Sequence, residues 1–150
     1  MTDLRELYQE VIIDHSRNPR NFGKLDAADR IARGNNPLCG DKLTLYLKLD
    51  ENDVITDVSF EGAGCAISIS SASLMTEMLK GKTLQQAEAL FQAFHGLIMG
   101  ENTPDRDAGL GKLKVLEGVK AFPSRVKCAT LAWHMLHAAL EKATQPVSTE

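Results

Sequence analysis

The sequence predicts an α+β domain in which a small antiparallel sheet packs against several helices. Apolar and polar residues alternate from Lys42 to Leu49, which is typical of a strand with one buried face. Val54 to Phe60 is rich in β-branched residues and follows the turn-forming Glu51-Asn52-Asp53, so the two segments are expected to pair as a hairpin. After Gly64 the apolar residues recur at helical spacing, which places most of the helices in the second half of the chain.

The first predicted element is a helix from Asp3 to about Ser16, because its apolar residues recur every three or four positions. Within it, Asp3 is followed three residues later by Glu6, as in a helix-capping arrangement. Asn18-Pro19 ends this helix, since a proline cannot continue it. Residues 24–38 show no clear period and finish in turn-forming residues, so no element is predicted there.

Two helices are predicted behind the hairpin, and local signals mark where each begins or ends. The first runs from Cys65 to Lys80 and is closed by Gly81, because glycine best accepts a left-handed helix cap. Thr83 and Gln86 form a capping box for the second helix, whose apolar residues continue to Ile98.

The C-terminal third of the chain is predicted to hold a loop, a short helix and a long helix. Gly100 to Gly111 is charged and favours a loop, and a short helix is expected from Leu110 to about Val119. The last helix is expected from Arg125 to Ala143, and the polar residues 144–150 are predicted to be a disordered tail. Because no repeat or linker is evident, residues 1–150 are expected to form a single domain.

The composition and charge of the chain argue against several classes of protein. The chain of 150 residues carries 17 basic and 20 acidic residues, for a net charge of −3, and it has no basic run, so nucleic acid is not expected as a partner. No apolar stretch approaches the ~18–20 residues that a membrane helix needs, and no membrane contact is expected. The N-terminus lacks the basic and apolar order of a secretory signal, so we expect a cytoplasmic location. Thiols stay reduced there, so the cysteines are expected to be ligands, nucleophiles or buried residues.

The three cysteines each lie where two predicted elements meet. Cys39 lies in the turn that enters the alternating strand, Cys65 lies between the second strand and a helix, and Cys128 lies near the start of the last helix. The free N–H groups and the positive dipole end at a helix N-terminus favour a thiolate over a thiol. Arg125 precedes Cys128 by three residues on the same helical face, which also favours a reactive thiolate.

A carboxylate accompanies the first cysteine. In Cys39-Gly40-Asp41 the thiolate and the carboxylate point the same way in extended backbone, so both can reach one ion. Together with Cys65 and Cys128 they give three sulfurs and one oxygen, a set that suits tetrahedral zinc, while thiolates also suit iron–sulfur clusters. With these four ligands, the net charge of the site is the same whether it holds a divalent ion or a doubly charged two-iron core. Electrostatics therefore does not choose the metal.

The spacing of the cysteines leaves a second interpretation open. Free cysteine often acts as a small buried hydrophobe, and separations of 26 and 63 positions contain no local metal motif of the CxxC kind. The other histidines and serines that could carry chemistry fall within predicted helices, which favours structural roles for them. They are His15, His95, His134, His137, Ser68, Ser70, Ser71 and Ser73. Among them, His134 and His137 are three apart on one helix and form the pair that could bind a metal.

Several motifs resemble the NifU/IscU-type family of iron–sulfur cluster assembly proteins, over roughly residues 3 to 142. They are Asn18-Pro19-Arg20-Asn21, Pro37-Leu38-Cys39-Gly40-Asp41, Gly62-Ala63-Gly64-Cys65 and the third cysteine, Cys128, at the start of the last helix. Scaffold members carry a histidine before the third cysteine, whereas Lys127 stands here, and the segment between the second and third cysteines is longer. Both departures resemble the SufU branch, which implies a SufE/NifU-like fold.

The resemblance implies a zinc protein that takes sulfur from a SufS-type cysteine desulfurase. It implies Zn²⁺ held by four ligands, which are Cys39, Asp41, Cys65 and Cys128. A histidine of the desulfurase would capture the zinc and free Cys39, which would accept the persulfide sulfur and act as a sulfurtransferase. Arg125 corresponds to a residue that supports this encounter and the ligand exchange, and a SufBCD-type cluster scaffold is the implied downstream partner.

Two alternatives share the same residues. The first is a scaffold that assembles a [2Fe-2S] cluster, or holds iron, on these ligands and passes the cluster on. The second is a structural zinc domain that recruits partners without sulfur chemistry. Structural sites are usually closed by cysteine or histidine, so the aspartate favours a more exchangeable ion.

Overall fold

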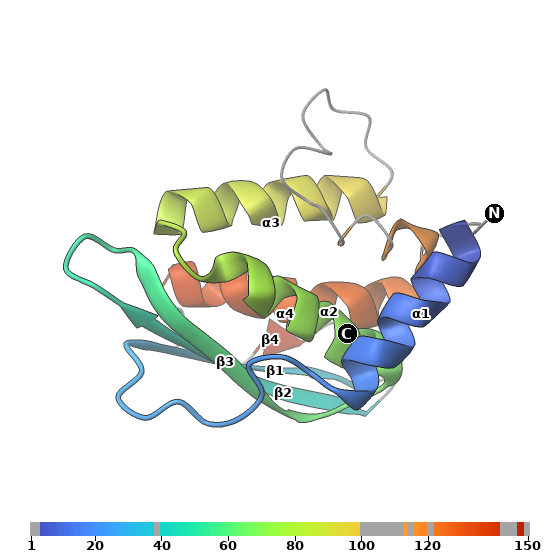
Figure 1. Cartoon of the computed structure of the whole chain (residues 1–150), viewed down its shortest axis with the longest axis horizontal. Helices are drawn as coiled ribbons and strands as arrows, with labels where there is room; N and C mark the ends of the chain where they lie inside the picture. Colours follow the sequence, from blue (N-terminus) through green and yellow to red (C-terminus); the bar gives the residue numbers. More distant parts are fainter. Residues whose placement is uncertain are drawn as a thin grey trace.

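A computed structural model describes residues 4–37, 40–99, 113, 116–119, 122–141 and 147–148 of the chain. The expected α+β class is confirmed, and the elements form three layers (Figure 1). A sheet forms the first layer, helices α2 (Ala66–Leu79) and α4 (Pro123–Leu140) cover one of its faces, and α3 (Leu84–Met99) packs against α4. Helix α1 (Leu4–Arg17) lies beside α2.

The predicted hairpin forms the centre of the sheet. Strand β2 (Asp41–Leu49) pairs antiparallel with β3 (Ile55–Ala63), so that Leu45 lies opposite Phe60. Both of these side chains are buried on the face that the helices cover. The alternation in the sequence therefore identifies the inner face of these two strands correctly.

Strand β1 (Arg30–Asn36) lies where the sequence predicts no element, so the prediction is wrong there. It pairs antiparallel with β2, and its inward residues are Ala32, Gly34 and Asn36, all buried. These residues are small or polar, so the strand alternates in burial without alternating in hydrophobicity. The reason is the close approach of α4, because a Cβ added to Gly34 would lie 2.7 Å from the side chain of Met135.

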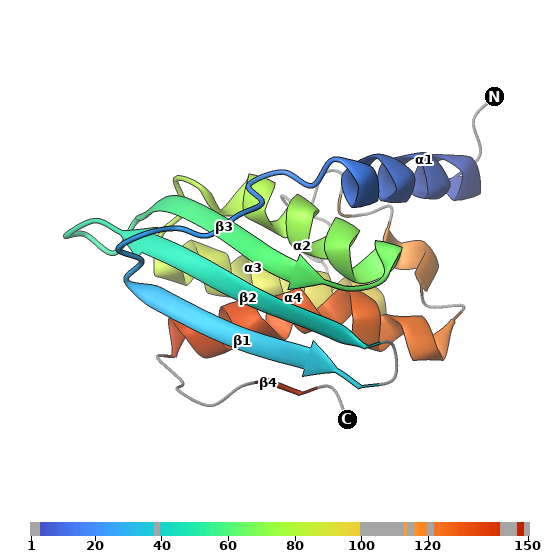
Figure 2. The same ribbon diagram turned by 90° about the horizontal axis from the view of Figure 1, so that it is seen from below.

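Strand β4 (Val147–Ser148) runs parallel to β1 beside Gly34 and Asn35 and completes the strand order β3-β2-β1-β4 (Figure 2). These two residues belong to the segment 144–150, which the sequence predicts to be a disordered tail, but they form a strand. The rest of the segment lies outside the described residues. A parallel bridge of this kind uses backbone groups, so the polar composition of the tail carries no signal for it.

The helices fall close to their predicted positions, although α4 begins at Pro123, before the predicted Arg125, and ends at Leu140, before the predicted Ala143. The predicted capping box is present, and Gly81 has the predicted left-handed backbone. The N–H of Gln86 donates to Thr83 Oγ1 at 3.1 Å and the N–H of Thr83 donates to Gln86 Oε1 at 2.9 Å, which is the expected capping box before α3. Gly81 follows α2 with φ +85°, in the left-handed region predicted for it. The cap predicted at Asp3 lies outside the described residues.

The segment between α3 and α4 is described in part. Leu116–Val119 forms a single 3₁₀ turn within the short helix predicted from Leu110 to Val119. Leu113, Leu116 and Val119 are buried, so this turn contributes to the core. The loop predicted from Gly100 to Gly111 lies outside the described residues.

Helix α4 is held against α2 and α3 through Trp133, which is fully buried. Its ring stacks on Phe94 with centroids 4.4 Å apart, and its Nε1–H donates to Ser71 Oγ at 3.1 Å. The Ser71 hydroxyl in turn donates to the carbonyl of Ala129 at 2.6 Å, so every polar group in this contact has a partner. The serines of α2 are thus packing residues, as the sequence favours.

Helix α1 and the turn after it are tied to α2 by buried polar groups. Ser73 Oγ accepts the backbone N–H of Arg20 at 2.8 Å and lies 2.7 Å from Nδ1 of His15. On the other ring nitrogen, Nε2 of His15 lies 3.5 Å from the carboxylate of Glu77. His15 therefore has the structural role that the sequence favours for it.

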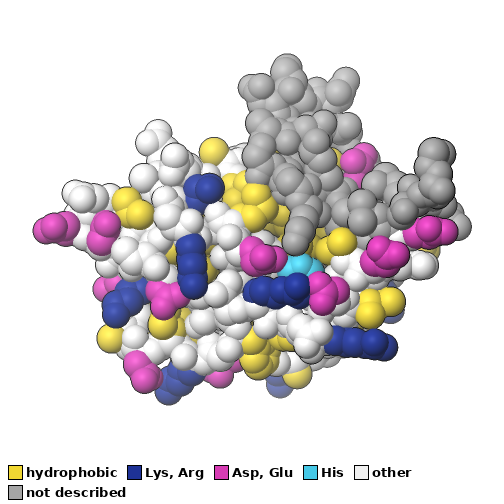
Figure 3. Space-filling view, viewed as in Figure 1, with side chains coloured by type: hydrophobic (Ala, Val, Ile, Leu, Met, Phe, Trp, Pro, Cys, Tyr) yellow, Lys and Arg dark blue, Asp and Glu magenta, His cyan; other side chains and the backbone are white. Residues whose placement is uncertain are grey.

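The surface charge and the character of the described helices agree with what the composition of the chain predicts. On the face seen in Figure 3, basic and acidic side chains are interspersed, in keeping with the small net charge. Within the described ranges, none of the helices combines the length and the apolar content needed to cross a membrane.

Candidate metal centre

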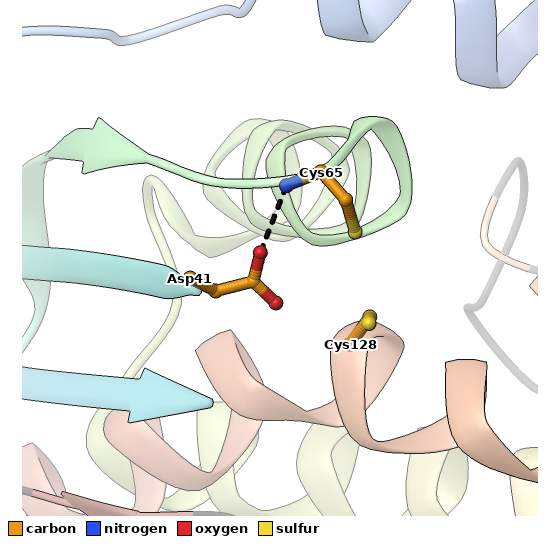
Figure 4. A group of neighbouring side chains, drawn as sticks. All are labelled: Asp41, Cys65 and Cys128. Carbon is orange, nitrogen blue, oxygen red and sulfur yellow. Dashed lines mark hydrogen bonds between the residues drawn. The ribbon is translucent and has the colours of Figure 1, made fainter. Parts of the chain in front are cut away.

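Asp41, Cys65 and Cys128 meet at one end of the sheet, each on a different element (Figure 4). Asp41 is the first residue of β2, Cys65 immediately precedes α2, and Cys128 lies in the second turn of α4. One ligand atom from each residue lies within 4.8 Å of the other two. Cys39, the fourth predicted ligand, lies outside the described residues.

Asp41 is buried, with 1% of its surface exposed, and both of its carboxylate oxygens accept hydrogen bonds. Oδ1 accepts the backbone N–H of Cys65 at 2.8 Å, and Oδ2 accepts the side-chain amide of Asn36 at 3.2 Å. A buried carboxylate needs such partners because leaving water without them costs several kcal/mol. The two bonds fix the plane of the carboxylate and leave lone pairs on both oxygens for a cation.

Cys65 is the N-cap residue of α2, where serine, threonine, aspartate or asparagine usually stands. Its Sγ accepts the backbone N–H of Ser68 at 3.5 Å and so replaces the usual oxygen of a helix cap. The preceding residue must be small, because a Cβ on Gly64 would lie 2.7 Å from Asp41 Oδ1 and 2.5 Å from Ser68 Oγ. Gly64 therefore allows the carboxylate to reach the Cys65 amide.

Cys128 is fully buried and lies in the second turn of α4. Its Sγ accepts the side-chain amide of Asn36 at 3.4 Å and lies 3.9 Å from the carbonyl oxygen of Ser124. Arg125 is exposed, one helical turn before Cys128, and Lys127 is half-buried beside it. These cations lie on the element that carries the cysteine, as the sequence predicts.

Asn36 is a site residue that sequence reasoning missed. Its amide contacts both Asp41 and Cys128, although neither a charge nor a thiol marks it as a ligand. It reaches them because it is the last residue of β1 and lies directly opposite Asp41 in the sheet. Because no pattern in the sequence predicts β1, this contact could not be predicted either.

The donor set fits a metal ion that prefers sulfur and oxygen. The 4.8 Å limit on the separation of the ligand atoms is about 1 Å more than the ~3.8 Å between sulfurs in tetrahedral zinc sites, so small side-chain rotations close the gap. Two thiolates and a carboxylate at this separation in a buried site would also repel one another without a cation. The described residues offer three ligands, one fewer than a tetrahedral site needs.

The histidines of α3 and α4 form a separate cluster around Phe91. The ring of His134 is 5.9 Å from that of His95, and Nδ1 of His137 lies 3.0 Å from the carboxylate of Glu88. Among the described residues, Asp41, Cys65 and Cys128 alone form a group of three potential ligands close enough for one metal ion. His134 and His137 therefore do not belong to such a group of three among the described side chains.

This cluster predicts a loss of stability in acid. Burial, followed by repulsion from His95 and His137, lowers the pKa of His134 below its ordinary value of 6.5. The unfolded chain therefore binds more protons than the folded chain once the pH falls below about 6.5, so the free energy of unfolding falls with pH there. His134→Gln should weaken this fall when urea unfolding is compared at neutral and mildly acidic pH. An unchanged pH dependence in the variant would contradict the prediction.

Comparisons with known proteins give consistent matches. The family model for the NifU-like N terminal domain matches residues 7–146. The chain is 43% identical over 140 residues to the zinc-dependent sulfurtransferase SufU of Bacillus subtilis, covering 93% of each chain. It is 41% identical over 143 residues to the iron–sulfur cluster assembly scaffold protein IscU of Streptococcus pyogenes, covering 95% of this chain and 88% of that protein.

Solved structures show the same architecture. A crystal structure from Fervidobacterium islandicum, described as that of an iron–sulfur cluster assembly scaffold protein for the SUF system (SufU), matches with a TM-score of 0.83 and 39% identity, covering 89% of this chain and 96% of that one. The N-terminal part of a NifU-like protein from Brucella abortus matches with a TM-score of 0.81 over 94% of this chain and 97% of that one. At 22% identity, this second match supports the fold alone.

Proposed function

Because the chain belongs to the NifU-like N-terminal domain family, we propose that it acts in iron–sulfur cluster assembly as a zinc-dependent acceptor of persulfide sulfur. The donor would be a SufS-type cysteine desulfurase. The observation that carries this proposal is the meeting of Asp41, Cys65 and Cys128 within 4.8 Å at the end of the sheet.

We propose that Cys39, Asp41, Cys65 and Cys128 together hold one Zn²⁺. The sulfur-rich donor set supports zinc, and so does the similarity to a relative that is named zinc-dependent. Bound zinc would keep the thiolates deprotonated and shielded from oxidation until the partner arrives. This reserve suits a protein that must accept sulfur only at an interface.

Hydrogen bonds hold three of the proposed ligands in place. Hydrogen bonds anchor Asp41 through both oxygens, Cys65 at a helix cap and Cys128 in the core. Cys39 belongs to the turn between β1 and β2, whose described residues Pro37 and Gly40 are exposed. The exposure of these two neighbours supports Cys39 as the ligand that a desulfurase histidine displaces while the other three residues stay in place.

The transfer step follows from thiol chemistry. The freed Cys39 thiolate attacks the outer sulfur of the persulfide on the desulfurase. A new sulfur–sulfur bond forms on Cys39, the bond to the desulfurase cysteine breaks, and that cysteine leaves as a thiolate. No external oxidant or reductant is required. We propose that Arg125, which is exposed one turn before Cys128, contacts the partner during this exchange.

A single turnover with a SufS-type desulfurase tests the proposal. Without added reductant, the extra sulfur should be found by mass spectrometry on the peptide that contains Cys39, and Cys39→Ala should abolish this label. When a thiol reductant is then added to release the transferred sulfur as sulfide, Cys39→Ala should also abolish the stimulated release of sulfide. The peptides that contain Cys65 and Cys128 serve as internal controls and should stay unlabelled. Undiminished sulfide release by Cys39→Ala would rule out the acceptor role.

A second candidate function is a scaffold that assembles a [2Fe-2S] cluster on the same residues. It is favoured by the 41% identity to a protein named as an IscU scaffold. Thiolate ligands suit such clusters as well as zinc. Protein purified without added metal distinguishes the two, because a bound cluster gives visible colour whereas a zinc protein is colourless.

A further inference from the structure

We propose that Asn36 is a positioning residue that holds Asp41 and Cys128 in the arrangement a metal ion requires. The inference rests on the metal site proposed above and adds a residue outside its four ligands. Asn36 is fully buried at the end of β1, opposite Asp41 across the sheet and next to Cys128 of α4. One amide group therefore links all three elements.

The two contacts made by Asn36 involve the same nitrogen. Nδ2 donates to Asp41 Oδ2 at 3.2 Å and to Cys128 Sγ at 3.4 Å, so each of its two hydrogens has an acceptor. The reversed amide would set its oxygen against a carboxylate and a sulfur, which are themselves acceptors. The donor orientation is thus the one that the surroundings dictate.

The oxygen of the Asn36 amide independently indicates a functional role for this side chain. Oδ1 of Asn36 is buried and has no hydrogen-bond partner among the described residues. A buried polar atom without a partner is destabilising, and an apolar residue at this position would avoid that cost. A role for the two donor hydrogens at the metal site explains why a polar side chain occupies the position.

The effect expected of Asn36 is pre-organisation. Asp41 is held from one side by the Cys65 amide and from the other by Asn36, so its carboxylate cannot rotate away from the site. The bond to Cys128 orients that sulfur and withdraws some of its negative charge, which tunes its bond to the metal. Partners of this kind typically contribute 10–100-fold to metal affinity.

The test compares Asn36→Leu and Asn36→Ala with Asn35→Leu, a matched control. Asn35 is the neighbouring asparagine on the same strand, half-buried on the opposite side of the sheet, and it makes none of these contacts. Zinc affinity is measured by competition with a chromophoric chelator. The thiolate-to-metal absorption of Co²⁺-substituted protein and the melting temperature of metal-free protein are recorded for each variant.

The Asn36 variants should bind zinc about 10–100-fold more weakly and shift the Co²⁺ absorption, while Asn35→Leu should change neither. If the Asn36 variants lower only the melting temperature of the metal-free protein, with affinity and absorption unchanged, the residue is merely structural and the inference is overturned. Asn36→Ala keeps the test decisive if Asn36→Leu does not fold. Wild-type protein that binds no zinc would overturn the proposed metal site, and this inference with it.

Discussion

Cys65→Ser is expected to abolish tight zinc binding while leaving helix α2 intact. Serine is among the preferred N-cap residues, so its hydroxyl can accept the N–H that Cys65 Sγ accepts in the native chain. The thiolate, however, is lost from the metal site. Zinc affinity, measured by chelator competition, should fall by more than the ~10–100-fold that follows loss of an outer partner.

This substitution separates the two roles of Cys65. The far-ultraviolet circular dichroism and the melting temperature of the metal-free variant should match those of the metal-free native chain, because the cap is preserved. Ser68→Ala is a useful comparison, because it keeps both the Cys65 thiolate and the backbone N–H that caps against it. This variant should bind zinc more tightly than Cys65→Ser, although it removes a hydroxyl 3.7 Å from Cys65 Sγ. Native zinc affinity in Cys65→Ser would show that Cys65 is not a ligand.

Removing zinc should lower the melting temperature by about 8–16 °C. The proposed ligands come from β2, α2 and α4 and from the turn before β2, so an ion bound by all of them links the sheet to both covering helices. With free zinc at a thousand times its dissociation constant, binding stabilises the folded state by about 4 kcal/mol. A change of 1 kcal/mol shifts the melting temperature of a chain of this size by about 2–4 °C.

The measurement is a thermal melt before and after dialysis against a chelator, with the zinc content verified. Returning zinc should restore the native melting temperature, whereas the same addition to Cys65→Ser should have little effect. An unchanged melting curve in a verified zinc-free sample would mean that the metal site is not coupled to folding.

The elements that sequence reasoning predicts correctly are those whose buried face is also apolar. Leu43, Leu45 and Leu47 of β2 are buried, and their alternation is visible in the sequence. The capping box at Thr83 is local and thus equally visible. In contrast, β1 buries Ala32, Gly34 and Asn36, and at Gly34 α4 approaches too closely for a larger side chain. The missing signal is therefore a consequence of tertiary packing.

The residues of the candidate site likewise differ in whether the sequence reveals them. Asp41, Cys65 and Cys128 are visible in the sequence because of their chemistry, and the structure brings them together. Their separations in sequence could not predict this proximity, which depends on how β2, α2 and α4 pack. Asn36 has no distinctive chemistry and belongs to the strand that the sequence does not reveal, so its place opposite Asp41 required the structure.

The central claim is that three cysteines and one aspartate hold a single zinc ion, and zinc-edge X-ray absorption tests it most directly. Protein purified without added metal should contain one zinc per chain, with three sulfurs at about 2.3 Å and one oxygen at about 2.0–2.2 Å. A zinc shell with fewer than three sulfurs, or protein that carries no zinc, would contradict the claim.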